Sequence, residues 1–133
     1  MADDNRKMNT PDLLRAYQWL FFSFRGRISR QAYWLAFFFI VTVLGAALQP
    51  TIDPQTGALS LRGGGLVVVA MLVAVIANLA IGVKRLHDFS APGLLAAALF
   101  VPGLSVIATL IIGLVPGNPR PNRFGQAPDI RPG

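Results

Sequence analysis

Three short polar clusters hold the residues whose types and spacing could do chemistry. They are residues 24–30, 84–88 and 122–125, and the second contains the only histidine, His87, beside Asp88. A histidine next to a carboxylate is a candidate general base with its orienting acid, which an enzyme acting on a lipid headgroup would need. The clusters lack a convincing nucleophile. We therefore predict no catalytic residue and expect that the protein is not an enzyme.

The same residues are poor candidates for a metal site. His87 and Asp88 supply two ligands at most, and the chain contains no cysteine and no second histidine. A structural zinc site takes four protein ligands and a catalytic zinc site takes three. We therefore predict no metal and no cofactor. We interpret the pair as part of a structural turn, with proton sensing by His87 as the alternative.

The arginines of the clusters are better suited to contacts with phospholipid headgroups or with other parts of the chain. Arg30 and Trp34 stand four residues apart, which suits an arginine–aromatic contact, whereas Arg85 and Asp88 can pair on one helix face. Arg123 can reach Asp88 if the tail folds back. The residues predicted to make such contacts are Arg25, Arg27, Arg30, Trp34, Arg85, His87, Asp88, Asn122 and Arg123.

The composition indicates that these clusters lie at the edges of a membrane. Of 133 residues, 53% are hydrophobic and only 14% are charged, whereas charged residues make up about a quarter of a soluble globular protein. The net charge of +6 lies beside apolar runs, where anionic headgroups attract cations. No basic and aromatic surface on a soluble domain is expected, so nucleic acid is not a predicted partner.

Hydrophobic periodicity predicts one all-α, polytopic membrane domain. Thr10-Pro11-Asp12 is typical of a helix start, and the apolar residues after it recur every three or four positions, as in an amphipathic helix on a membrane surface. Ser29 can cap the first hydrophobic segment. The predicted parts are a frayed terminus (1–9), an interfacial helix (10–24), a first span (32–48), a loop (49–65), a second span (66–83), a polar turn (84–92), a broken third segment (93–115) and an irregular tail (116–133).

The third segment contains Pro102-Gly103 near its middle, so it is either one kinked crossing or a re-entrant hairpin. Cation bias places the amino terminus in the cytoplasm. Three crossings leave eight cations inside and four outside, whereas a hairpin leaves eleven inside and one outside. The two halves are too short to cross a core of about 30 Å separately, so sequence length slightly favours the kinked crossing.

Small residues recur four apart in the second span, at Ala70, Ala74, Asn78 and Gly82. Helices approach closely along such a face. We expect this face to pack against a similar one in the third segment, at Ser105, Thr109 and Gly113. Asn78 is interpreted as a hydrogen-bonding partner for a neighbouring helix.

The three clusters, in this order and with these apolar segments between them, resemble the small bacterial inner-membrane proteins classed as domain of unknown function 805. The resemblance covers about residues 19 to 128, and its motifs are Phe24, Gly26, Arg27, Arg30, Tyr33, Trp34, Arg85 to Asp88, Pro116-Gly117 and Asn122 to Gly125. Residues 91–95 depart from the family pattern, because a tryptophan pair is missing there. The resemblance implies a bacterial inner membrane and a shared architecture, without an established activity.

These observations favour a structural or interaction protein, whose partners are anionic lipids and, as further possibilities, a second copy or another membrane protein. The alternative is a small transporter or channel component, in which Asn78, Ser105, Thr109 and the broken third segment line a path.

Overall fold

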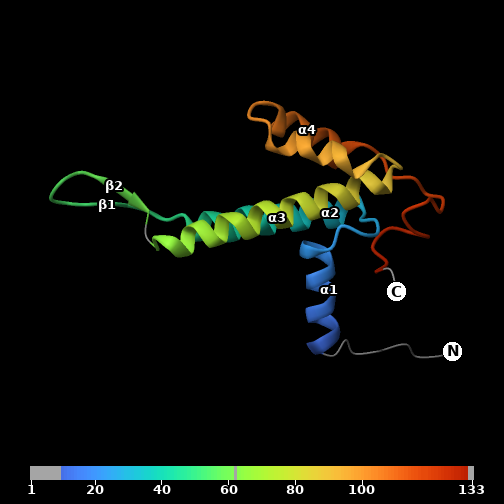
Figure 1. The fold of residues 1–133 in the computed structure, drawn as a ribbon, viewed down its shortest axis with the longest axis horizontal. Helices are drawn as coiled ribbons and strands as arrows, with labels where there is room; N and C mark the ends of the chain where they lie inside the picture. Colours follow the sequence, from blue (N-terminus) through green and yellow to red (C-terminus); the bar gives the residue numbers. More distant parts are fainter. Residues whose placement is uncertain (1–9, 62, 132–133) are drawn as a thin grey trace.

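The structure, a computed structural model, describes residues 10–61 and 63–131, and it is mostly helical (Figure 1). The predicted frayed terminus lies outside the described residues. The elements in chain order are helix α1 (Thr10–Phe22), helix α2 (Arg30–Ala47), strand β1 (Pro50–Ile52), strand β2 (Leu59–Leu61), helix α3 (Gly65–Asp88), the 3-10 helix η1 (Gly93–Phe100) and helix α4 (Leu104–Leu114).

Helices α2 and α3 lie side by side and run in opposite directions (Figure 1). The predicted cap of the first segment is confirmed, because the Ser29 hydroxyl accepts a hydrogen bond from the amide of Ala32 at 3.2 Å. At 1.5 Å per residue the two helices are about 27 and 36 Å long. Both are long and apolar enough to cross a bilayer.

The loop between them contains a short antiparallel hairpin that the sequence analysis did not predict. Strands β1 and β2 pair from Pro50 opposite Leu61 to Ile52 opposite Leu59. Asp53 holds the turn, since its carboxylate accepts the amide of Gln55 at 2.8 Å, and this bond lowers the pKa of Asp53. The hairpin projects beyond the end of the helix pair (Figure 1).

Helix α3 continues five residues past its expected end at Val83. The predicted polar turn therefore starts as a helical turn, and Lys84, Arg85 and Asp88 are buried in it. Their charges do not end the helix because the tail and α1 cover them, as described below.

The third hydrophobic segment is not one kinked helix. It consists of η1 and α4, separated by residues 101–103, where Gly103 has a φ of +82° that suits glycine. A Cβ added to Gly93 would lie 3.0 Å from His87 Nε2, and the carbonyl of Val115 accepts a hydrogen bond from Arg85. Both ends of the segment therefore lie beside the end of α3. The two parts form a hairpin in which each arm is about 16 Å long.

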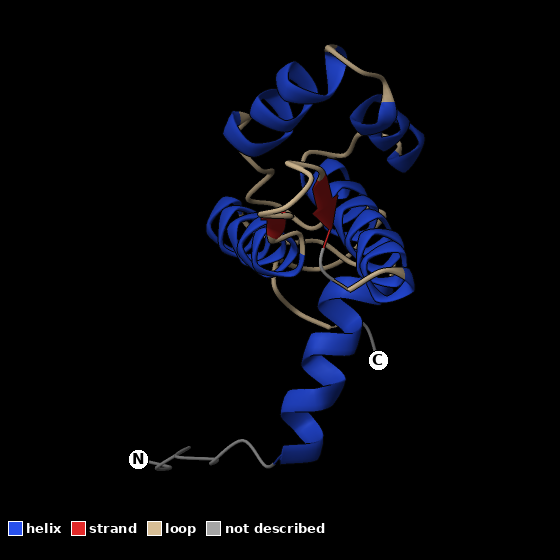
Figure 2. Cartoon of the chain, turned by 90° about the vertical axis from the view of Figure 1, so that its left-hand side faces the viewer, coloured by secondary structure: helices blue, strands red, loops and turns tan. Residues whose placement is uncertain are grey.

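Helix α1 lies on the opposite side of the α2–α3 pair from this hairpin (Figure 2). Its axis runs across that of α3, and its last turn packs near the end of α3 (Figure 1). None of its residues is buried. This arrangement matches that of a helix lying along a membrane surface while α2 and α3 pass through the membrane.

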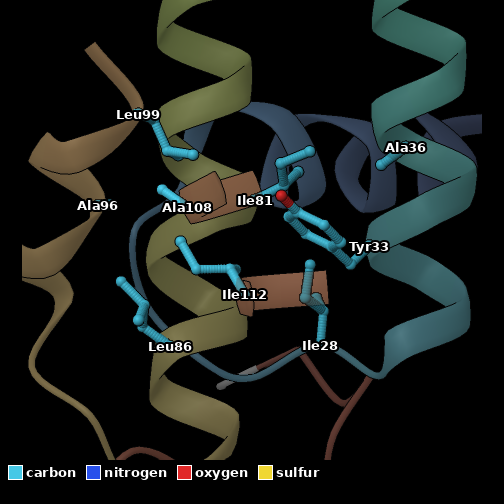
Figure 3. Close-up of a cluster of buried hydrophobic side chains, with 9 residues drawn as sticks. All are labelled: Ile28, Tyr33, Ala36, Ile81, Leu86, Ala96, Leu99, Ala108 and Ile112. Carbon is cyan, nitrogen blue, oxygen red and sulfur yellow. The ribbon is translucent and has the colours of Figure 1, made fainter. Parts of the chain in front are cut away.

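A cluster of buried apolar side chains joins α2, α3, η1 and α4 (Figure 3). Small residues allow the close approach, but the partners differ from those expected. A Cβ at Gly82 would lie 2.7 Å from Leu99 of η1, and one at Gly113 would lie 2.5 Å from the Trp34 ring of α2. Ala70 and Ala74 instead line an apolar groove on the side of α1 and α2. These four residues therefore have other partners than expected, whereas Asn78, Ser105 and Thr109 line one cavity between α3 and α4.

Candidate functional site

Asp88, in the last turn of α3, is the centre of a buried charged cluster. The Arg27 guanidinium donates to Asp88 Oδ1 from Nε at 3.1 Å and from Nη2 at 2.9 Å. Arg85, one turn before Asp88, donates to the other oxygen, Oδ2. The three side chains are at most 3% exposed. A buried carboxylate needs compensation of this kind, because removing its hydration costs several kcal/mol.

The remaining donors of the two arginines hold the carboxyl-terminal tail. Arg27 Nη1 donates to the carbonyls of Arg120 at 3.0 Å and Gly125 at 3.2 Å, and Arg27 Nη2 donates to the carbonyl of Asn118. The amide of Asn118 in turn donates to the Asp88 carbonyl at 2.9 Å. Arg27 thus connects the start of α2, the end of α3 and the tail.

Asn122 and Phe124 of the tail bind residues at the end of α3 and just after it. The Asn122 amide donates to the His87 carbonyl at 2.9 Å and to Ser90 Oγ at 3.2 Å. The Phe124 ring stacks on the His87 imidazole with centroids 3.8 Å apart. His87 Nδ1 lies 3.3 Å from the Gly26 carbonyl. The structure therefore brings the three polar clusters of the sequence together.

Two expected contacts differ in the structure. Arg123 does not pair with Asp88, since both carboxylate oxygens bind Arg27 and Arg85, and its guanidinium lies over the Phe124 ring at 4.6 Å. The Trp34 indole donates to the Gly113 carbonyl at 3.2 Å, and among the described residues Arg30 makes no cation–π contact with Trp34. Arg30 and Arg25 are exposed at the edge of the cluster.

Lys84 was not among the predicted contact residues, yet it is completely buried. Its ammonium group donates to the carbonyls of Trp19, Leu20 and Ser23, each at 2.6 Å, and lies 4.9 Å from the centre of the Trp19 ring. The last carbonyls of a helix have no intrahelical partner, and a cation there is favoured by the helix dipole. Lys84 therefore fixes the end of α1 to α3.

The contacts of Gly117 and Asp129 were also not predicted. Gly117 lies so close to the Asp88 carboxylate that no side chain fits there. Asp129 Oδ1 accepts the Ser29 amide at 2.9 Å, and the Asp129 amide donates to the Arg27 carbonyl at 2.9 Å. Gly117 contacts Asp88, and Asp129 contacts Arg27 and Ser29, all of which are distant in the sequence. The Pro116-Gly117 pair was the only local sequence feature that pointed to either contact.

The geometry of the cluster is that of a structural joint. Asp88 is held by two arginines, and His87 is held between Phe124 and the Gly26 carbonyl, so the two do not form a base–acid pair. Within residues 10–61 and 63–131, no group of three histidine, cysteine or acidic side chains is arranged for a metal ion.

Asn78 and the cavity that it lines lie apart from this joint, between α2, α3 and α4. The outer faces of the helices carry exposed apolar side chains such as Leu35 at 73%, Leu66 at 74% and Leu94 at 84%. Exposed apolar surface of this extent is typical of contact with a membrane.

Comparison with known proteins agrees with these features. The family described as "Protein of unknown function (DUF805)" matches residues 21–126. The chain is 27% identical over 112 residues to the inner membrane protein YhaH of Escherichia coli K12, which covers 82% of this chain and 89% of YhaH. It is 30% identical over 105 residues to the inner membrane protein YhaI of the same strain, which covers 79% of this chain and 85% of YhaI. No solved structure matches the chain. The chain is therefore an inner-membrane protein of unknown biochemical activity and belongs to the DUF805 family.

Proposed function

We propose that the protein crosses the inner membrane twice, through α2 and α3, and that the η1–α4 hairpin enters the membrane from the cytoplasmic side and returns. Each arm of the hairpin is about 16 Å long, half of a bilayer core of about 30 Å. The arm formed by η1 packs against α3, and both ends of the segment lie beside the end of α3.

The distribution of charge supports an orientation with both ends of the chain in the cytoplasm. Every lysine and arginine that the structure describes lies in α1, at the end of α3, or in residues 23–30 and 115–131. These segments gather at one end of the α2–α3 pair, and the β-hairpin lies at the other (Figure 1). An excess of cations marks the cytoplasmic side.

The function that this geometry supports best is a structural one, in which the cytoplasmic end binds anionic phospholipid headgroups. The observation that carries the proposal is the division of the cations into two sets. Arg27, Lys84 and Arg85 are buried and hold the protein together, whereas six further arginines remain exposed around them. These are Arg15, Arg25, Arg30, Arg120, Arg123 and Arg131.

The exposed set has the charge and position for headgroups. The described acids exposed at the same end are Asp12 and Asp129, so cations exceed acids there. A cation near an anionic membrane surface contributes about 1 kcal/mol. Six such side chains on a rigid joint would retain anionic lipid around the protein and hold α1 against the membrane surface.

Native mass spectrometry of the full chain, purified with equal amounts of phosphatidylglycerol and phosphatidylethanolamine, tests this role. We expect retained phosphatidylglycerol to exceed phosphatidylethanolamine, and the ratio to fall about fivefold for each arginine removed in Arg25→Gln, Arg30→Gln and Arg123→Gln. Arg62→Gln, which removes the same charge from the sequence between the two proposed spans, serves as the control. Equal retention of the two lipids by the unaltered protein would refute the proposal.

A further inference from the structure

A cavity of about 460 Å³ lies between α2, α3 and α4, away from the charged joint. Its polar lining comes from Asn78 of α3 and from Ser105 and Thr109 of α4. Trp34 and Phe37 of α2 form an aromatic wall with rings 5.8 Å apart and perpendicular. The volume is within the range of about 300–1,000 Å³ for small-molecule sites.

With α2 and α3 placed across the membrane as proposed above, the cavity lies below the headgroups, at the depth of the acyl chains. Asn78 is ten residues before Asp88, which places it about 15 Å along α3 from the charged joint. Thr109 is five residues before the end of α4, about 8 Å from the same end. The rim includes Val106, which is 66% exposed, and Leu110, which is 47% exposed, so the cavity reaches the surface that faces lipid.

One polar atom of the cavity wall, Asn78 Oδ1, lacks a partner among the described residues. In a hydrocarbon environment an unsatisfied polar group costs several kcal/mol. Three hydrogen-bonding side chains around one cavity in the acyl-chain region therefore point to a ligand rather than to packing alone.

The lining restricts the chemistry of that ligand. No charged side chain lines the cavity, so the ligand carries no net charge. The depth excludes a molecule anchored by a phosphate headgroup. Hydrogen-bonding groups on α3 and α4 can hold two separate oxygen atoms, and the aromatic wall favours a planar ring.

We propose that this cavity binds the ring of an isoprenoid quinone or quinol. Such a molecule is uncharged, dissolves in the acyl-chain region and carries two oxygens on opposite sides of a planar ring. The Ser105 and Thr109 hydroxyls donate to one ring oxygen. Asn78 Nδ2 donates to the other oxygen of a quinone, and Asn78 Oδ1 accepts the hydroxyl of a quinol. The isoprenoid chain leaves between Val106 and Leu110 into the lipid. The site is distinct from the arginines that bind headgroups, and no redox step is part of the proposal.

Fluorescence of Trp34 provides the test, because quinones quench tryptophan and the chain has two tryptophans. Trp19→Phe leaves Trp34 as the only one. In phosphatidylcholine nanodiscs, which contain no anionic lipid, decylubiquinone is expected to quench Trp34 with a saturating curve. Adding Ser105→Ala and Thr109→Val removes two hydrogen bonds and is expected to raise the Kd by about tenfold or more.

Thr42→Val is the matched control, since Thr42 is an exposed hydroxyl on α2 outside the cavity lining. Its Kd is expected to be unchanged, and thermal unfolding establishes that all variants fold. Quenching of Trp34 that rises linearly with the decylubiquinone concentration would overturn the proposal. The same Kd in all variants would overturn it too. If dioleoylglycerol stabilises the protein against thermal unfolding while decylubiquinone gives no saturable quenching, the proposal would also be overturned. The ligand would then be a neutral glycerolipid. None of these outcomes affects the test of headgroup binding.

Discussion

Arg27 and Asp88 are 61 residues apart in the sequence, yet Nε and Nη2 of the one guanidinium donate to the same carboxylate oxygen, at 3.1 and 2.9 Å. The other donors of Arg27 bind three carbonyls of the tail. This one side chain therefore determines whether the start of α2, the end of α3 and the tail form a single unit.

Replacement of Arg27 by glutamine is expected to destabilise the protein by about 3–5 kcal/mol, because Asp88 keeps only Arg85 as a charged partner in a buried site. Arg27→Lys keeps the charge but lacks the planar set of donors. The stability of this variant is therefore expected to lie between that of the unaltered protein and that of Arg27→Gln. Equilibrium unfolding in detergent measures the change. Arg25→Gln, which removes an exposed arginine two residues away, should remain within about 0.5 kcal/mol of the unaltered protein. Equal stability of the Arg25 and Arg27 variants would contradict the structural role of Arg27.

Lys84→Met is expected to release α1 while α2, α3 and the hairpin remain folded. The methionine keeps much of the apolar side chain but loses three hydrogen bonds to the carbonyls of Trp19, Leu20 and Ser23. A hydrogen bond to a charged group contributes about 1.5–3 kcal/mol. Hydrogen exchange of the amides in residues 16–23 should therefore accelerate by at least tenfold, with little change in α3. Uniform acceleration over the whole chain would instead mean that Lys84 supports global stability rather than α1.

Gly117→Ala is expected to displace the tail, because the added methyl group would occupy the position of the Asp88 carboxylate. Gly45→Ala is the matched control: a Cβ at Gly45 meets nothing within 4 Å, and alanine in a helix is favoured over glycine by about 1 kcal/mol. We expect a lower melting temperature for Gly117→Ala and an unchanged or higher one for Gly45→Ala. Loss of the tail contacts should also make residues 118–131 sensitive to protease. A melting temperature for Gly117→Ala equal to that of Gly45→Ala would argue against this packing.

The parts of the fold that depend on neighbouring residues could be predicted from the sequence. Ser29 caps α2 because the hydroxyl and the amide that it accepts are three residues apart. The mainly helical, membrane-type character followed from the apolar runs. A helix at α1 followed from its one-sided apolar pattern and its Thr10-Pro11-Asp12 start.

The charged joint could not be predicted in the same way. The chain has twelve cations, and nothing local identifies Arg27 rather than Arg123 as the partner of Asp88, since that choice depends on how residues 115–131 fold back. The end of α3 was predicted too early for a related reason. Lys84 and Arg85 break the apolar pattern, but in the structure Lys84 binds carbonyls of α1, and Arg85 binds Asp88 and the carbonyl of Val115. Gly117 became informative only once its contact with Asp88 was known.

Cysteine labelling in intact cells can decide the path of the third segment, and the chain has no native cysteine to interfere. Gln126→Cys lies in the tail and Thr56→Cys in the turn of the β-hairpin, at opposite ends of the α2–α3 pair. Both positions are exposed, so a difference in labelling by a membrane-impermeant maleimide reports their side and not their burial. We expect Thr56→Cys to react in intact cells and Gln126→Cys to react only after the membrane is opened. Reaction of both in intact cells would place the tail outside, require a third crossing and separate Arg27 from the carbonyls of Asn118, Arg120 and Gly125 that it binds in the structure.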